Sequence, residues 1–225
     1  MDVMPRTVPA LRWVGFAPYA MVSAVHVVAL AMDATPTAAV TKMLLMPLLA
    51  VGVLWAARDR ARGIPIALLL AAITLSWLGD ETGVFFAFAP EIPGMLLFFG
   101  LAHLAYIWLF LRHLTRRSVH GWWLAYAAWW VAMLAVLVPH LGVLTVAVAG
   151  YGLVLGGTAL SAARCTAITT VGGVFFLASD SILAFRLFLP EAMPDWTSPL
   201  VMLTYCLGQG LLAAGVLGAL GRSRG

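Results

Sequence analysis

The chain consists almost entirely of apolar runs of roughly 20 residues, the length that spans a bilayer as an α-helix, and its charges lie mainly in short segments between them. Of the 225 residues, 63% are hydrophobic and 10% are charged, and the mean hydropathy is +1.01. A water-soluble domain carries about 25% charged residues, so this surface is expected to face lipid. The runs do not alternate as barrel strands do. The sequence therefore predicts an all-α, polytopic membrane protein, because a helix satisfies its own backbone hydrogen bonds in lipid.

About eight spanning helices are predicted, and residues 1–225 are expected to form a single integral membrane domain. The predicted spans are residues 9–31, 36–57, 64–86, 93–111, 121–138, 140–162, 166–188 and 198–220. Only Pro139 separates the fifth span from the sixth. Residues 1–7 are too polar and too short for a cleavable signal, so the first span is expected to be retained.

The cations predict the orientation. With a cytoplasmic N-terminus, eleven of the 13 Lys and Arg residues fall in inner loops or at inner helix ends: Arg6, Arg12, Arg58, Arg60, Arg62, Arg112, Arg116, Arg117, Arg164, Arg222 and Arg224. Lys42 and Arg186 fall toward the outer side. This positive-inside bias predicts that both termini are cytoplasmic. The protein is expected in the cell (plasma or inner) membrane. Nucleic-acid binding is not expected, because these arginines lie in short loops with no folded domain to organise them.

Two aspartates lie inside predicted spans, where an ionisable side chain costs several kcal/mol and usually serves function. Asp180 lies within the seventh span, and Asp80 lies in the outer part of the third. The alternative for either residue is an interhelical or helix-terminal hydrogen bond. Further polar side chains in the spans are candidate substrate-binding residues, although each could instead join helices or, for the lysine, reach the interface. They are Lys42, Ser76, His103, Tyr106, Ser179, Tyr205 and Gln209.

Part of the sequence recurs at an offset of one hundred residues. The matching pairs are Asp80 and Asp180, Phe85 and Phe185, Phe88 and Phe188, Pro90 and Pro190, and Glu91 and Glu191. A tyrosine follows in the next span of each half. This pattern favours a parallel repeat of four plus four helices, which would bring the two aspartates toward one cavity in the outer half of the membrane.

Four segments resemble the YhhN family of lysoplasmalogenase-like membrane proteins. They are Ser-Trp-Leu-Gly-Asp at 76–80, Gly-Leu-Ala-His-Leu-Ala-Tyr at 100–106, Phe-Leu-Ala-Ser-Asp-Ser-Ile-Leu-Ala at 176–184 and Tyr-Cys-Leu-Gly-Gln-Gly-Leu-Leu at 205–212. The Thr-Lys pair at 41–42 is also similar to that family. The resemblance implies hydrolysis of the vinyl-ether bond of a lysoplasmalogen, a lysophospholipid, to a fatty aldehyde and glycerophosphoethanolamine or glycerophosphocholine. It implies neither a metal nor an organic cofactor.

The candidate residues suit this chemistry. A vinyl ether is protonated on the carbon β to oxygen, and water then captures the oxocarbenium ion. One carboxylic acid and one carboxylate are needed, and two aspartates in a shared, poorly solvated pocket favour that division. We expect Asp180 to be the acid and Asp80 the base, although the reverse assignment fits nearly as well. Tyr106, His103, Tyr205 and Gln209 would orient water or the ether oxygen, and Lys42 would bind the headgroup phosphate.

Two other classes stay open on the sequence alone. Paired intramembrane aspartates and repeated halves are also normal in a proton-coupled transporter of lipids or small molecules. A non-catalytic protein that binds membrane lipids is the second alternative. Proton-coupled flux in sealed vesicles would favour the transporter, whereas aldehyde release in detergent would favour the enzyme.

Overall fold

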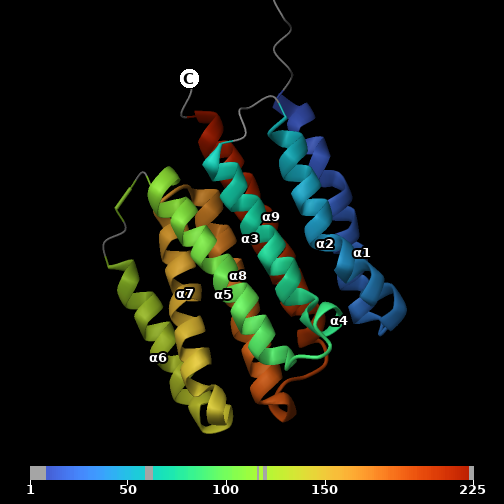
Figure 1. Ribbon diagram of the computed structural model, residues 1–225, viewed down its shortest axis with the longest axis vertical. Coiled ribbons are helices and arrows are strands. Elements are labelled where there is room, and N and C mark those ends of the chain that lie inside the picture. Colours follow the sequence, from blue (N-terminus) through green and yellow to red (C-terminus); the bar gives the residue numbers. More distant parts are fainter. Residues whose placement is uncertain (1–8, 59–62, 116, 119–120, 223–225) are drawn as a thin grey trace, which may run out of the picture.

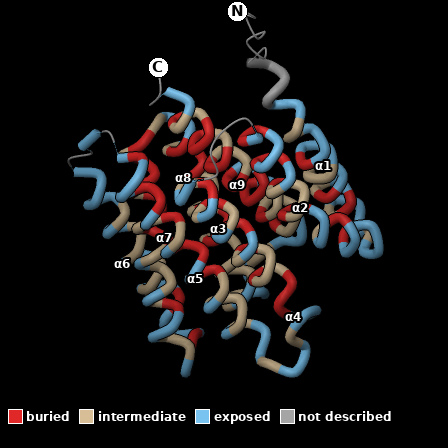
Figure 2. Tube along the Cα trace, turned by 45° about the horizontal axis from the view of Figure 1, so that its top comes forward, coloured by how far each residue is buried: buried red, intermediate tan, exposed pale blue. Residues whose placement is uncertain are grey.

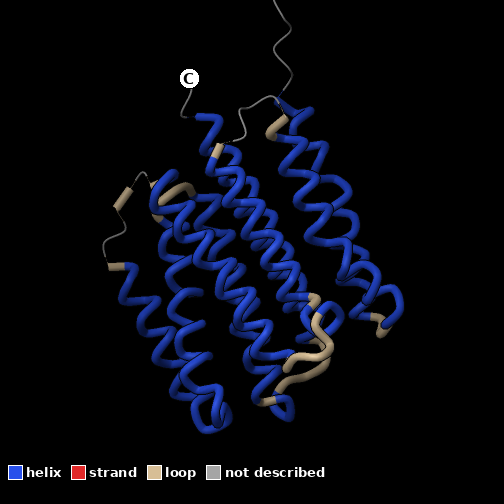
Figure 3. Tube along the Cα trace, viewed as in Figure 1, coloured by secondary structure: helices blue, strands red, loops and turns tan. Residues whose placement is uncertain are grey.

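The computed structural model describes residues 9–58, 63–115, 117–118 and 121–222, with side chains from residue 13 onward. The described residues are helical with short connections and contain no strand (Figure 3). The eight long helices are α1 (Ala17–Ala31), α2 (Thr35–Ala56), α3 (Ile64–Asp80), α5 (Glu91–Leu109), α6 (Trp122–Leu141), α7 (Thr145–Ala163), α8 (Ala167–Phe188) and α9 (Thr197–Arg222). The short elements are η1 (Pro9–Phe16), α4 (Thr82–Phe85), η2 (Phe110–Leu114), η3 (Gly142–Leu144) and η4 (Pro190–Ala192).

Six stretches of the described chain are long and apolar enough to cross a membrane. One of them, Trp122–Ala163, contains both α6 and α7, which lie side by side as a hairpin (Figure 1). The remaining long helix, α3, is also apolar but has 17 residues, which makes it shorter than these six stretches. The prediction of a polytopic helical membrane protein is therefore confirmed.

Helix starts follow local sequence signals. A proline occupies the first turn of α1, α2 and α3, where the missing backbone N–H has no intrahelical acceptor to lose. At the start of α8, Thr166 and Thr169 form a reciprocal capping box.

Two predicted boundaries are wrong. The third span was expected to continue to residue 86, but α3 ends at Asp80 and the short helix α4 follows. The reversal between the fifth and sixth spans was expected at Pro139, but α6 continues through that residue to Leu141. The chain turns instead at Gly142, whose φ is +52°. The fixed φ of proline is compatible with a helix near its end, whereas a positive φ favours glycine.

Successive long helices run in alternating directions, and the described ends of the chain lie at the same end of the bundle (Figure 1). Arg58, Arg112, Arg117, Arg164 and Arg222 are at that end as well, in agreement with the predicted distribution. Arg6, Arg60, Arg62, Arg116 and Arg224 lie outside the described residues, and the side chain of Arg12 is not described. That this end is cytoplasmic stays a prediction.

The core follows α9, the most buried of the candidate spans, while α6 lies at the edge of the bundle (Figure 2). Helices α8 and α9 make the closest pair. A Cβ added at Gly172 would lie 2.8 Å from the backbone nitrogen of Leu212, and one added at Gly208 would lie 2.9 Å from that of Phe176. Small residues let backbones approach in this way inside membranes. The aspartate-bearing helices α3 and α8 each pack against the next long helix, α5 and α9 respectively, which agrees with the predicted repeat at this point.

Candidate functional site

Asp180 lies in the second half of α8 and is 8% exposed. The Tyr151 hydroxyl on α7 donates a hydrogen bond to its Oδ2, and His103 Nε2 on α5 lies 3.5 Å from the same oxygen. The other ring nitrogen of His103 is 3.1 Å from Thr158 Oγ1. Two neighbouring helices, α5 and α7, therefore hold this carboxyl group of α8 in place through an imidazole and a tyrosine.

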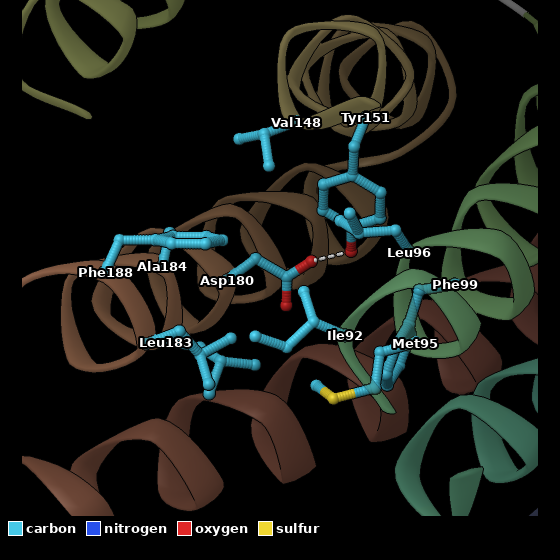
Figure 4. Close-up of a pocket in the computed structure, with 11 residues that line it drawn as sticks. Ile92, Met95, Leu96, Phe99, Val148, Tyr151, Asp180, Leu183, Ala184 and Phe188 are labelled. Atoms are coloured by element: carbon cyan, nitrogen blue, oxygen red, sulfur yellow. Dashed lines mark hydrogen bonds between the residues drawn. The ribbon is translucent and has the colours of Figure 1, made fainter. Parts of the chain in front are cut away.

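An apolar cavity lies beside this carboxyl group. Asp180 points between Tyr151 and the side chains of Ile92 and Met95, with Leu183 and other apolar residues around it (Figure 4). The cavity measures ≈ 50 Å³, about enough for a few water molecules. The carboxyl group is thus presented to a small space with almost entirely apolar walls.

A larger groove adjoins this cavity between α5 and α7. It measures ≈ 400 Å³, and it shares Leu96 and Tyr151 with the cavity at Asp180. Gly100 and Gly150 line the groove and leave it wide, because neither has a side chain that would fill it. A Cβ at Gly150 would meet nothing within 4 Å, and one at Gly100 would meet only Tyr151, at 4.0 Å. Leucines form much of the remaining wall, so the groove offers an apolar path from the side of the bundle toward Asp180.

Asp80 has different surroundings. It is the last residue of α3 and is partly buried. The Tyr205 hydroxyl on α9 donates to its Oδ2 at 2.7 Å, and Lys42 Nζ on α2 donates to its backbone carbonyl, also at 2.7 Å. The next residue, Glu81, is 3% exposed, and its Oε1 has no hydrogen-bond partner. The end of α3 thus gathers two carboxyl groups and one ammonium group.

A chain of polar side chains leads from Tyr205 into the core. Gln209 Nε2 donates to Ser76 Oγ at 2.9 Å and approaches the Tyr205 hydroxyl at 3.4 Å. The Tyr106 hydroxyl donates to Gln209 Oε1 at 2.6 Å. Ser76, Tyr106 and Gln209 are fully buried, so they hold α3, α5 and α9 together around Asp80.

Aromatic rings link the surroundings of the two aspartates. The Tyr205 ring lies 5.6 Å from the Phe176 ring and 6.2 Å from the Phe99 ring, between centroids. Phe176 lies 4.9 Å from His103, and Phe99 lines the cavity at Asp180. Asp80 does not line that cavity, so a cavity shared by both carboxyl groups stays a prediction.

The predicted site residues therefore divide into three sets. Ser179 Oγ, which is buried, donates to the Val201 carbonyl and joins α8 to α9. His103 lies beside Asp180, with its Nε2 3.5 Å from the Asp180 Oδ2. The remaining candidates surround Asp80, namely Lys42, Ser76, Tyr106, Tyr205 and Gln209.

Sequence reasoning missed Tyr151, the hydroxyl donor to Asp180. The available signal was a phenol group within a predicted span, a position of the same kind as those of Tyr106 and Tyr205. Thr158, which contacts His103, gave no signal because hydroxyls are common between membrane helices.

The described residues contain no group of three or more His, Cys, Asp or Glu side chains that could hold a metal ion. The site is instead built from two carboxyl groups, each hydrogen-bonded to a tyrosine, and a lysine. Such a set can move protons and bind an anion.

The apolar spanning helices make this a multi-pass integral membrane protein, and its buried polar cluster is a candidate functional site. Residues 37–216 match the YhhN family, and the chain belongs to that family. No curated protein and no solved structure matches the chain.

Proposed function

We propose that the protein hydrolyses the vinyl-ether bond of a lysoplasmalogen, releasing a fatty aldehyde and a glycerophospho-alcohol. The YhhN family is associated with lysoplasmalogenase activity. The observation that carries the proposal is the placement of Asp180: a buried carboxyl group, fixed by Tyr151, facing an apolar cavity that adjoins a lipid-sized groove. An alkenyl chain lying in that groove would bring its reactive carbons toward this carboxyl group.

In the first step Asp180 acts as the acid. Its proton goes to the β-carbon of the alkenyl group, and the π electrons of the C=C bond form the new C–H bond. The α-carbon and the ether oxygen then share the positive charge of an oxocarbenium ion. The assignment of this role to Asp180 is supported by its position on the wall of the apolar cavity.

In the second step water attacks the α-carbon while Asp80 takes a proton from it. The resulting hemiacetal collapses as its hydroxyl proton returns to Asp180 and the C–O bond breaks. Asp80 delivers its proton to the departing glycerol oxygen. Both carboxyl groups regain their starting states, and one water molecule is consumed. The more exposed position of Asp80 at the end of α3 supports its role beside water.

The hydrocarbon chain of the substrate must enter through an opening larger than the cavity at Asp180, because that cavity measures only ≈ 50 Å³. The groove between α5 and α7 supplies that space, and Tyr151 and Leu96 form the wall between the two. We propose that substrate binding moves these side chains and joins the spaces. The hydrocarbon chain then stays in contact with lipid while its first carbons reach Asp180.

The test is aldehyde release by the purified full-length protein in detergent. A vinyl-ether lysophospholipid should yield aldehyde, detected by mass spectrometry, and should do so with a chelator present. The matched ester-linked lysophospholipid should not be cleaved. An ester needs an activated nucleophile and an oxyanion site. The one GxSxG match in the sequence, at 221–225, begins within helix α9, whereas a nucleophile elbow follows a strand.

Two outcomes would count against the proposal. Cleavage of the ester at a similar rate would indicate a different reaction. If the folded protein releases no aldehyde, the proposed hydrolase activity is rejected. In that case, proton-coupled lipid flux in sealed vesicles would assign the aspartates to transport.

A further inference from the structure

A third cavity lies between α1, α2, α8 and α9, at the end of the bundle opposite the described ends of the chain. This end is the predicted outer end. It measures ≈ 310 Å³ and is lined by residues from the end of α1, the start of α2, the end of α8 and the start of α9. Leu183 lines both this cavity and the one at Asp180. The two spaces are therefore neighbours across a single leucine side chain.

The only lysine of the chain and one arginine face this cavity. Lys42 and Arg186 both line it, and they are the two cations that the sequence places on the outer side. The other cations whose side chains are described lie at the opposite end of the bundle. Two positive charges in one cavity, on a side with few other cations, indicate a site for an anion.

Neither cation forms a salt bridge with a carboxylate among the described residues. Lys42 Nζ donates to the Asp80 backbone carbonyl at 2.7 Å. Arg186 Nη1 donates to the Pro194 carbonyl and the Thr197 hydroxyl. These bonds fix both side chains at the wall, yet each group keeps further N–H donors, three on an ammonium and five on a guanidinium in all.

The other walls also suit a phosphate. Thr35 and Ser198 contribute hydroxyls from the first turns of α2 and α9, and the N-terminal end of a helix attracts negative charge. His26 lines the cavity from α1, where its Nδ1 lies 2.8 Å from Thr41 Oγ1. The carboxyl groups of Asp80 and Glu81 do not line this cavity.

We propose that this cavity binds the phosphodiester of a lysophospholipid headgroup. The inference rests on the proposed function for its choice of a lipid ligand. With the phosphate between Lys42 and Arg186, the glycerol passes Leu183, and the vinyl ether reaches Asp180. The hydrocarbon chain then continues toward the groove between α5 and α7, so that head and chain occupy opposite sides of Asp180.

Binding of a lipid that the enzyme cannot cleave tests the site without requiring catalysis. The probes are ester-linked lysophosphatidylethanolamine and the monoacylglycerol with the same chain, which lacks phosphate. The full chain is titrated with each lipid in micelles, and the mole fraction that gives half of the maximal rise in unfolding temperature is measured. Wild-type protein should require less lysophosphatidylethanolamine than monoacylglycerol.

Removing either cation should abolish this preference. Lys42→Met and Arg186→Gln should each raise the half-saturating fraction of lysophosphatidylethanolamine by about tenfold, the value of one hydrogen bond to a charged group. The response to monoacylglycerol should not change. Lys42→Arg and Arg186→Lys keep the charge and should retain most of the preference, which distinguishes binding from misfolding. Arg222→Gln removes a cation at the opposite end and should behave as wild type.

Unchanged lysophosphatidylethanolamine binding in the two charge-removing variants would overturn the proposal, as would an equal loss for monoacylglycerol. If millimolar inorganic phosphate stabilised wild-type protein through Lys42 and Arg186 while the two lipids bound equally, the site would take free phosphate and the headgroup assignment would fail. A preserved phosphate preference without aldehyde release would refute the vinyl-ether hydrolase and leave this site standing.

Discussion

Asp80 and Asp180 occupy matching positions in a sequence repeat, yet their surroundings differ. Each accepts a hydrogen bond from a tyrosine, but Tyr205 comes from α9 and Tyr151 from α7. Strict repetition would pair Asp180 with Tyr106, which instead donates to Gln209. Two similar segments thus place two carboxyl groups in the half of the bundle away from the described chain ends, and unrelated neighbours then give each a separate environment.

The position along the helix explains much of this difference. Asp180 is followed by two further turns of α8, so it faces neighbouring helices and an apolar cavity. Asp80 ends α3, where the short helix α4 follows and Lys42 reaches the backbone. One carboxyl group is therefore suited to contact a hydrocarbon chain, and the other lies beside charge and is less buried.

The largest expected effect comes from neutralising either carboxyl group. Asp80→Asn and Asp180→Asn should each lower kcat for vinyl-ether cleavage by about 10²–10⁴-fold, because asparagine can neither give a proton to carbon nor take one from water. Aldehyde release by purified variants measures this loss. Unfolding temperatures close to that of wild type would confirm that both variants fold.

Unequal losses would sharpen the comparison. Full activity in both folded variants would end the two-aspartate mechanism. A loss confined to Asp180→Asn would leave Asp180 as the one essential carboxyl group and assign Asp80 to the structural network of Tyr205 and Gln209.

Removing the tyrosine hydroxyls should have the next largest effect. Tyr151→Phe and Tyr205→Phe each delete the hydrogen bond to one aspartate, and kcat should fall by about 10–100-fold, as expected for a bond to a charged group. Tyr106→Phe is the matched control, because its hydroxyl contacts Gln209 and neither aspartate. That variant should keep its kcat while losing about 1 kcal/mol of unfolding free energy. An equal fall in kcat for all three would show that the tyrosines act through stability alone.

The sequence predicted the helices better than the contacts between them. Apolar runs, prolines and charges determine where a helix can lie in a membrane, so the all-α fold, both aspartates and the polar candidates around them could be located. Tyr151 was missed because its partner Asp180 is 29 residues away on another helix. Ser179, a predicted substrate contact, directly precedes Asp180 in the sequence, but adjacent residues on a helix point in different directions, and its hydroxyl bonds to α9.

A smaller effect is expected from closing the groove between α5 and α7. Gly150→Leu fills open space and should raise KM for long-chain lysoplasmalogen by about tenfold, comparable to a methylene mismatch in an apolar pocket. A short-chain substrate should be cleaved as before. Gly218→Leu is the matched control, because a Cβ there also meets nothing within 4 Å and Gly218 does not line the groove. Equal KM values for the two variants would show that the hydrocarbon chain of the substrate does not lie in the groove between α5 and α7.

The smallest effects should come from the two serines near the aspartates, which the sequence suggested as substrate contacts. Ser179→Ala removes a bond to the Val201 carbonyl, and Ser76→Ala removes the partner of Gln209 Nε2. Each should cost about 1 kcal/mol of unfolding free energy and leave KM unchanged, because both hydroxyls are buried and already bonded to protein. Denaturation of the purified variants measures the first quantity, and aldehyde release at varied substrate measures the second. A rise in KM for Ser76→Ala alone would place the lipid against α3 and bring Asp80 into direct contact with substrate, whereas a rise for Ser179→Ala alone would require α8 to rotate on binding.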